Sequence, residues 1–227
     1  MIEFKDVVMS YDSDTVALNG INLVINDGEF VFIVGRSGAG KTTLTKLLMR
    51  EERISSGKLT VDGFKLDKMP KRKVPYLRRS LGVVFQDFRL FPNMTVYENV
   101  AFAMRVVGEK NSVIKKRVPY FLNLVELTDK ADRFPGELSG GEQQRVAFAR
   151  AIANNPKIVI ADEPTGNVDR NMSLELMDLL VRINKLGKTV IVVTHDMELV
   201  EKFKKRTLTI DDGVIVSDKN GGVSIED

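Results

Sequence analysis

The sequence contains no cysteine, which excludes disulfide bonds and cysteine-ligated zinc. No apolar run approaches the roughly 18 residues of a membrane-spanning helix. The N-terminus, residues 1–6, lacks the basic-then-apolar order of a signal peptide. Internal repeats, low-complexity linkers and long heptad runs are also absent from the sequence. We therefore expect a cytoplasmic protein, and any membrane role must come through a partner.

The sequence also lacks a strong charge imbalance. It contains 34 Lys and Arg residues and 31 Asp and Glu residues, which give a formal charge of +3 and a pI near 9.0. Because the two signs are interspersed, solubility explains this composition as well as a nucleic-acid footprint does, and we expect no nucleic-acid partner. The 227 residues, 43% of them hydrophobic, suffice for one α/β domain or two small subdomains.

Hydrophobic patterning predicts both strands and hairpins. Alternating apolar and polar residues predict strands at 2–10 and 18–25, joined by a turn at Asp12–Asp14. Apolar runs predict further strands, and the last two are of the kind buried in parallel sheets: 30–34, 81–85, 158–161 and 190–194. Turn residues predict hairpins near 59–63 and 207–216.

Helical periodicity is concentrated in the middle of the chain. Thr95 and Glu98 form a capping box that starts a helix through Met104. A second helix is predicted at 113–127, where Pro119 should either kink it or mark its true start. Others are predicted at 42–49, 142–153 and 171–185. The pattern indicates one α/β core with a helical insertion.

One stretch predicts a phosphate-binding loop, because it matches G-x-x-x-x-G-K-[ST] between a predicted strand and a predicted helix. Glycines let consecutive backbone N–H groups face a polyphosphate, and the helix N-terminus adds its positive dipole. Lys41 would neutralise phosphate charge and the Thr42 hydroxyl would ligate Mg²⁺. A glycine-rich turn that binds nothing is the alternative. The candidate residues are Gly35, Arg36, Ser37, Gly38, Ala39, Gly40, Lys41, Thr42 and Thr43.

A second candidate anion site lies far along the chain. Ser139 and Glu142 form another capping box, and the glycines between them, Gly140 and Gly141, expose N–H groups at a helix start. A well-capped helix without a ligand is the simpler reading. One nucleotide should need only one such site, however. Two half-sites on one chain therefore predict that each nucleotide is sandwiched between two copies, in a head-to-tail homodimer that forms when the nucleotide binds.

Residues 138–145, LSGGEQQR, resemble the signature motif of the ABC (ATP-binding cassette) superfamily. The resemblance covers essentially the whole chain. It implies a P-loop NTPase (RecA-like) α/β core with an antiparallel β subdomain at 1–86 and 156–227, and a helical subdomain insertion at 87–155 that carries the signature. It also implies an ATPase with ATP and Mg²⁺ as cofactors.

The resemblance assigns roles to single residues. It implies that Asp162 holds the Mg²⁺ shell, that Glu163 polarises the attacking water and that Gln86 contacts the metal. It also implies that His195, the sole histidine, contacts the γ-phosphate and that Tyr11 stacks on adenine. The alternatives are surface carboxylates, a solvated glutamine, a passive histidine and an edge-strand tyrosine.

Asp169 matches the aspartate that the family has at this position, and it is a further candidate for contact with the nucleotide across the dimer. The residues before it, 166–168, read Gly-Asn-Val where the family usually has Ser-Ala-Leu. This departure makes the cross-dimer contacts there less certain, although hydrolysis does not depend on it.

Residues 84–92, 95–104 and 162–167 resemble the branch of the family that holds cell-division ATPases. The resemblance implies a partner of the FtsX type, an integral membrane protein. It also implies a peripheral position at the inner face of the membrane and an indirect link to extracellular peptidoglycan hydrolases. The nearest alternative is the ATPase of a lipoprotein-release or drug/macrolide export transporter.

Phe88, Phe91 and Tyr97 are candidate anchors for the membrane partner, although they could instead fill the core of the insertion. The sequence gives less support to two other functional classes, a DNA-repair ATPase and a scaffold that binds ATP without hydrolysing it. DNA-repair relatives carry a long coiled coil or zinc cysteines that this sequence lacks. A scaffold that binds ATP without turnover would not need both Glu163 and His195.

Overall fold

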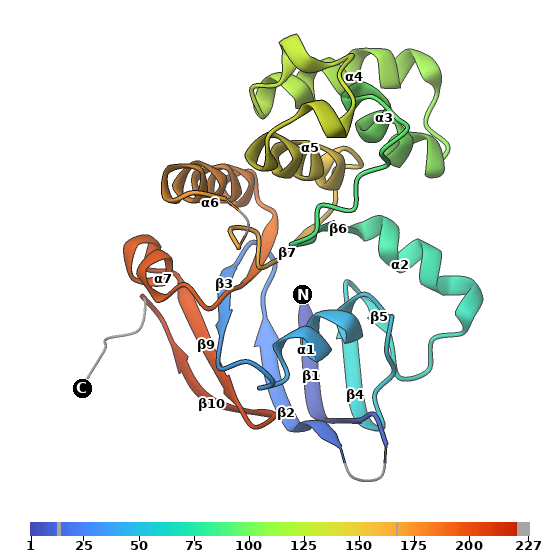
Figure 1. Ribbon diagram of the computed structural model, residues 1–227. Coiled ribbons are helices and arrows are strands. Elements are labelled where there is room, and N and C mark those ends of the chain that lie inside the picture. Colours follow the sequence, from blue (N-terminus) through green and yellow to red (C-terminus); the bar gives the residue numbers. More distant parts are fainter. Residues whose placement is uncertain (13–14, 167, 222–227) are drawn as a thin grey trace.

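The computed structural model describes residues 1–12, 15–166 and 168–221 and contains two β-sheets (Figure 1). The smaller sheet is antiparallel, with strand order β2-β1-β4-β5. Its strands are β1 (Ile2–Ser10), β2 (Val16–Ile25), β4 (Ser56–Val61) and β5 (Phe64–Lys65). This confirms the predicted pairing of the first two strands and the hairpin that follows Val61. Two residues of the predicted turn, 13 and 14, lie outside the described residues.

The larger sheet has the order β10-β9-β3-β8-β7-β6. Every neighbouring pair is parallel except the terminal hairpin of β9 and β10. Its strands are β3 (Phe30–Val34), β6 (Leu81–Val84), β7 (Ile158–Asp162), β8 (Thr189–Val193), β9 (Arg206–Asp211) and β10 (Val214–Lys219). Because β3, β7 and β8 are parallel neighbours, their carboxyl ends meet at one edge, where ligands bind in sheets of this kind.

Helices cover the larger sheet and form a separate cluster at one end of the molecule, where α3, α4 and α5 lie together (Figure 1). The helices are α1 (Lys41–Leu48), α2 (Val74–Ser80), α3 (Val96–Val106), α4 (Asn111–Leu124), α5 (Gly140–Ile152), α6 (Arg170–Lys185) and α7 (Met197–Phe203). Short 3₁₀ turns are η1 (Lys71–Lys73), η2 (Thr128–Lys130) and η3 (Pro135–Glu137). The boundaries 1–86, 87–155 and 156–227 stay predictions.

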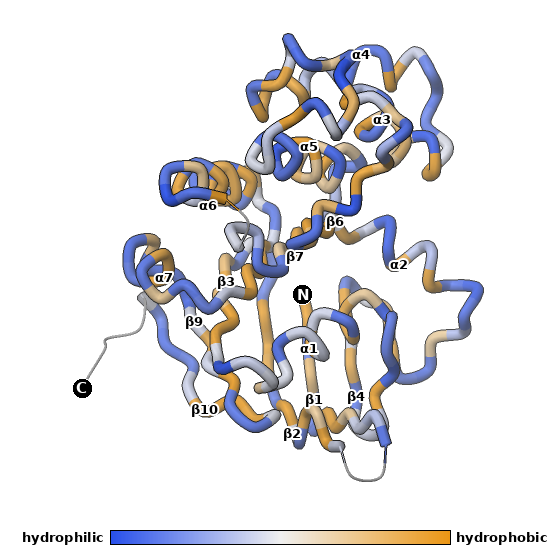
Figure 2. Tube along the Cα trace, in the orientation of Figure 1, coloured by the Kyte–Doolittle hydropathy of each residue, from blue (hydrophilic) through white to orange (hydrophobic). Residues whose placement is uncertain are grey.

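Alternation along β3 explains why its sequence is apolar throughout. Phe30 and Phe32 face the core that contains α3 to α7, whereas Val31 and Ile33 face the core shared with α1 and the smaller sheet. A strand covered on both faces has no position for a polar side chain. Figure 2 shows the central strands largely in hydrophobic colours.

Several predicted boundaries were wrong. The strand predicted at 81–85 ends at Val84, and α4 begins at Asn111, so Pro119 lies inside the helix and does not mark its start. Packing of one face, including Ile114 and Val118, against the core outweighs the local cost of the proline. The helices α2 and α7 were not predicted, because seven residues each are too short for a clear helical period.

Candidate active site

A cavity of about 740 Å³ opens at the carboxyl edge of the larger sheet, beside the N-terminus of α1. Its walls come from the end of β1, the start of β2, the loop after β3, and the ends of β7 and β8. The lining residues are Tyr11, Thr15, Val16, Ala17, Gly35, Arg36, Ser37, Gly38, Gly40, Lys41, Thr42, Thr43, Asp162, Glu163, Val193 and His195. The volume suits a nucleotide-sized ligand.

The loop between β3 and α1 depends on glycine. Gly35 and Gly40 have φ values of 152° and 107°, in the region that side chains rarely adopt. A Cβ at Gly35 would lie 2.1 Å from the Ile210 carbonyl oxygen, and one at Gly40 would lie 2.6 Å from that of Ala17. The loop can therefore reach this position, between β2 and β9, only with glycine at both places.

Lys41 begins α1 and turns back over the loop. Its ammonium group donates hydrogen bonds to the carbonyl oxygens of Gly35, at 2.7 Å, and Arg36, at 2.9 Å. The backbone N–H groups of the first helical turn have no intrahelical partner and face the same space. Positive charge and donors thus converge on one point, as an anion requires. The predicted loop residue Ala39 is buried and does not line the cavity.

Tyr11 stands at the mouth of the cavity. Its hydroxyl lies 3.1 Å from Thr43 Oγ1, and the residue remains 48% exposed. The ammonium of Lys46 lies 6.0 Å from the ring centroid. The hydroxyl contact restrains the ring at the mouth of the cavity, and its stacking on adenine stays a prediction.

Asp162 ends β7 inside the cavity. Thr45 of α1 donates a hydrogen bond to its Oδ2 at 3.3 Å. Burial raises the pKa of Asp162 above its ordinary value, the Thr45 bond opposes this, and the neighbouring Glu163 carboxylate raises it further. Lys41 and Arg89 lower the same pKa. A carboxylate whose charge is poorly compensated is ready to receive a cation.

Glu163 and His195 meet at the cavity wall. Glu163 Oε1 lies 2.9 Å from His195 Nδ1, and the Glu163 N–H donates to the Val193 carbonyl oxygen at 2.9 Å. The backbone of Glu163 is left-handed, with φ of 48°, which aims its side chain at His195. The Glu163 side chain is 18% exposed and that of His195 is 72% exposed. A water held here could lose a proton to the carboxylate.

The cavity fits Mg²⁺ only together with a ligand that carries phosphate. Thr42 and Asp162 offer oxygen ligands, which this hard cation prefers. Within the described residues, no group of three or more His, Cys, Asp or Glu side chains could hold a metal ion by itself. Magnesium usually takes one or two carboxylates plus substrate phosphates, so the donor set fits a metal–nucleotide complex.

The second predicted anion site lies outside this cavity. Ser139 caps α5: its Oγ accepts from the Glu142 N–H at 3.3 Å, and its own N–H donates to Glu142 Oε2 at 2.9 Å. Lys130 bonds the same carboxylate and, with the Ser139 N–H, lowers the pKa of Glu142. Gly141 packs on α6, where a Cβ would meet Met172 at 2.7 Å. Ser139, Gly140, Gly141 and Glu142 do not line the cavity.

Gln86 and Asp169 also lie outside the lining residues. A Cβ at Gly166 would lie 3.0 Å from Gln86 Nε2, so Gln86 approaches the loop that follows Glu163. Asp169 caps α6 by accepting from the Met172 N–H at 3.0 Å. Asn167 of the predicted cross-dimer segment lies outside the described residues. The roles of Gln86 and Asp169 stay predictions.

Two polar residues that sequence reasoning missed support the site. Thr45 holds Asp162, as described above. Gln144 is 1% exposed, and its Nε2 donates to the Pro164 carbonyl oxygen at 2.8 Å, next to Glu163. Its position four residues before the buried Phe148 places it on the inner face of α5, and this helical spacing was a usable signal.

Comparison with known proteins agrees with this geometry. Residues 18–166 match the family described as "ABC transporter". The dimeric ATP-binding cassette MJ0796, solved in a post-hydrolysis state with ADP and Pi, is 36% identical with a TM-score of 0.88, over 97% of this chain and 98% of that chain. CbiO1 from Clostridium perfringens is 33% identical with a TM-score of 0.89, over 96% of this chain and 88% of that chain. The chain belongs to the ABC transporter family, and it is an ATP-binding, ATP-hydrolysing cassette.

Three relatives that align with this chain over nearly their full length carry the same name, "Cell division ATP-binding protein FtsE". The Bacillus subtilis protein is 52% identical over 98% of this chain and 97% of its own length. The Mycobacterium tuberculosis protein is 48% identical over 98% and 97%. The Escherichia coli protein is 43% identical over the full length of both.

Proposed function

We propose that the chain is the FtsE-type ATPase of bacterial cell division, paired with an integral membrane protein of the FtsX type. In this proposal ATP binding and hydrolysis switch the pair, and the switch regulates extracellular peptidoglycan hydrolases. In this proposal the protein sits at the inner face of the cell membrane through its partner. None of the helices among the described residues has the length and hydropathy of a membrane span. Full-length similarity to FtsE proteins supports this choice.

The observation that carries the mechanism is the separation of the two anion-binding elements. The cavity beside Lys41 contains the phosphate loop, whereas Ser139, at the start of α5, is not among its lining residues. The site is therefore half of a composite site. Two copies, related head to tail, would each contribute a phosphate loop to one nucleotide and a signature serine to the other. Thr42 and Asp162 would hold the Mg²⁺, which would neutralise phosphate charge.

Within such a site, each residue has a distinct role. Lys41 and the loop N–H groups bind the β- and γ-phosphates. Glu163 accepts the proton of the attacking water, and His195 orients this carboxylate through the 2.9 Å contact. Closure of the dimer would exclude bulk water from the exposed side of His195.

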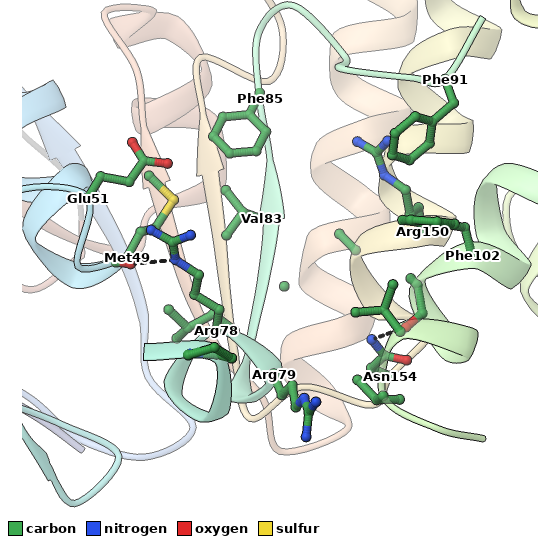
Figure 3. Close-up of a pocket in the computed structure, with 17 residues that line it drawn as sticks. Met49, Glu51, Arg78, Arg79, Val83, Phe85, Phe91, Phe102, Arg150 and Asn154 are labelled. Atoms are coloured by element: carbon green, nitrogen blue, oxygen red, sulfur yellow. Dashed lines mark hydrogen bonds between the residues drawn. The ribbon is translucent and has the colours of Figure 1, made fainter. Parts of the chain in front are cut away.

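The partner's docking site is proposed at a groove of about 520 Å³ between α2, β6, α3 and α5 (Figure 3). Phe85, Phe91 and Phe102 give it apolar walls, and Arg78, Arg79 and Arg150 supply positive charge. Such a groove suits a short helix that carries apolar side chains and an acidic residue.

Of the three candidate anchors, only Phe91 lines this groove. It is 39% exposed, and its ring lies 4.7 Å from that of Phe102, edge to face. Phe88 and Tyr97 are partly buried against the main core, which matches the alternative reading for those two.

The identity of the membrane partner is tested by capturing the tagged protein from membranes and identifying the proteins that copurify with it. Recovery of an FtsX-type protein supports the proposal, and recovery of a lipoprotein or macrolide permease overturns its cell-division part. Phe91→Ala should reduce capture. Tyr120→Ala, at a tyrosine on α4 that is 61% exposed and lies outside the groove, should not.

The composite site is tested by mixing two inactive variants. A Ser139→Arg protein retains a phosphate loop and a Lys41→Ala protein retains a signature serine, so a mixed dimer has one intact site. Hydrolysis should reappear in the mixture. If the mixture is no more active than either variant alone, each chain carries a complete site and the sandwich is wrong.

A further inference from the structure

The segment that follows Gln86 holds an unusual backbone conformation. Phe88 and Arg89 are consecutive residues with φ of 57° and 48°, although neither is glycine. Side chains disfavour this region, so the surrounding structure must hold the turn in place. The turn begins two residues after Gln86, the glutamine that the family resemblance places at the metal.

Arg150 restrains this turn from the neighbouring helix α5, in addition to the backbone bonds that Phe88 and Arg89 donate within the turn. Its guanidinium donates to the carbonyl oxygen of Phe88 at 2.8 Å and to that of Arg89 at 2.5 Å. A planar guanidinium can bond two adjacent acceptors at once, whereas a lysine ammonium presents a single point charge. Arg150 lies in the last turn of α5, the helix that begins at Ser139.

The other side of the turn is held by Arg89 itself. Its guanidinium lies 3.7 Å from the centroid of the Phe85 ring, and its Nε donates to Asp87 Oδ1 at 3.1 Å. Burial lowers the pKa of Arg150 and the nearby charge of Arg89 lowers it further, so two cations are held against each other across the turn. The carbonyl oxygens of Phe88 and Arg89 are the groups that compensate this repulsion.

We infer that Arg150 is a positioning residue for hydrolysis, which acts by fixing the turn after Gln86. The inference rests on the proposed function, because it requires Gln86 to act in the site. It adds a physical link: Arg150 and Phe85 also border the groove proposed for the membrane partner (Figure 3). An occupant of the groove that displaces the Arg150 guanidinium would shift Gln86 without touching the phosphate loop.

The test is a double-mutant cycle of ATP hydrolysis with Arg150→Met and Gln86→Ala. Arg150→Met should lower kcat about 10- to 100-fold, the usual effect of a small misplacement, while KM and ATP affinity stay unchanged. Arg150→Lys should recover part of the loss, and it is the variant to use if Arg150→Met does not fold. Arg117→Met is the matched control, because Arg117 lies on α4 in the same helical cluster but pairs with Glu109 and lines neither the groove nor the cavity.

The cycle separates the outcomes. If Arg150 acts through Gln86, the double variant hydrolyses ATP within about twofold of Gln86→Ala alone. Multiplicative losses would overturn the inference and leave the role of Gln86 standing. Full activity of Gln86→Ala would overturn both. An equal loss in Arg117→Met would show that removal of an arginine elsewhere in the helical cluster lowers the rate as much as loss of the contact with the turn, and would also overturn the inference.

Discussion

Replacement of Glu163 by glutamine gives the sharpest test of the chemistry. The change removes the carboxylate but keeps the size of the side chain, so the amide can still contact His195 Nδ1, now 2.9 Å from Glu163 Oε1. The left-handed backbone at this position strains both residue types alike. The variant should therefore fold normally, and its defect should be confined to proton removal from water.

The expected loss follows from that role. A positioned general base contributes about 10²–10⁴ in rate, which corresponds to about 2.7–5.5 kcal/mol. ATP affinity should be equal or higher, because Glu163 and Asp162 both line the cavity and one of two negative charges near the phosphates is removed. Bound ATP that is not hydrolysed should hold the dimer closed.

Phosphate release at saturating ATP measures the rate, calorimetric titration measures affinity, and light scattering measures the dimer. Glu198→Gln is the matched control, since Glu198 lies near His195 in sequence but pairs with Arg170 outside the cavity. Hydrolysis at the parent rate in Glu163→Gln would refute the assignment of the base. A loss of ATP affinity in proportion to the rate would indicate misfolding of the site instead.

Four further variants probe the loop and the metal carboxylate. Lys41→Ala should weaken ATP binding by about 1.5–3 kcal/mol, roughly 10- to 150-fold, and unchanged affinity by titration contradicts the loop assignment. Asp162→Asn should abolish Mg²⁺-dependent hydrolysis yet stabilise the nucleotide-free protein at neutral pH. Burial raises the folded-state pKa of Asp162, so the parent loses stability as pH rises through that pKa. The difference in unfolding midpoint between Asp162→Asn and the parent should shrink as the pH falls toward 3.8, the ordinary pKa of an aspartate. A difference that does not change with pH would refute this reasoning. Gly40→Ala should lower unfolding free energy by about 2–5 kcal/mol through strain and overlap with Ala17. Gly38→Ala, with nothing within 4 Å of its Cβ, should lose only the strain, about 1–2 kcal/mol.

Local features of the site were predictable because short-range sterics and hydrogen bonds determine them. Ser139 and Glu142 form the predicted capping box, and Asp162 and Glu163 end the strand where the apolar run stops. Gly40 takes the positive φ that the loop pattern requires. Each of these depends on neighbours only a few residues away.

The prediction failed where a local signal was weak or overridden. Pro119 was predicted either to kink a helix or to mark its start, and the second alternative is wrong because the apolar face of α4 extends to both sides of the proline. Gln144 lies in the signature stretch but had no predicted role, and Thr45 belongs to no motif. Their roles depend on partners 20 and 117 residues away, respectively. The split of the three aromatic candidates, with Phe91 in the groove and Phe88 against the core, also depends on packing.

The sequence by itself determined that this protein has a phosphate loop, two capped helix starts and a buried parallel sheet, because each is written in contiguous residues. The tertiary structure decided which of these meet. Parallel strand order brings Glu163 to His195, and the position of α5 takes Ser139 away from Lys41 while its far end, at Arg150, reaches the turn after Gln86. Contacts of this kind arise from the packing of whole elements across the sheet, which no short stretch of sequence specifies.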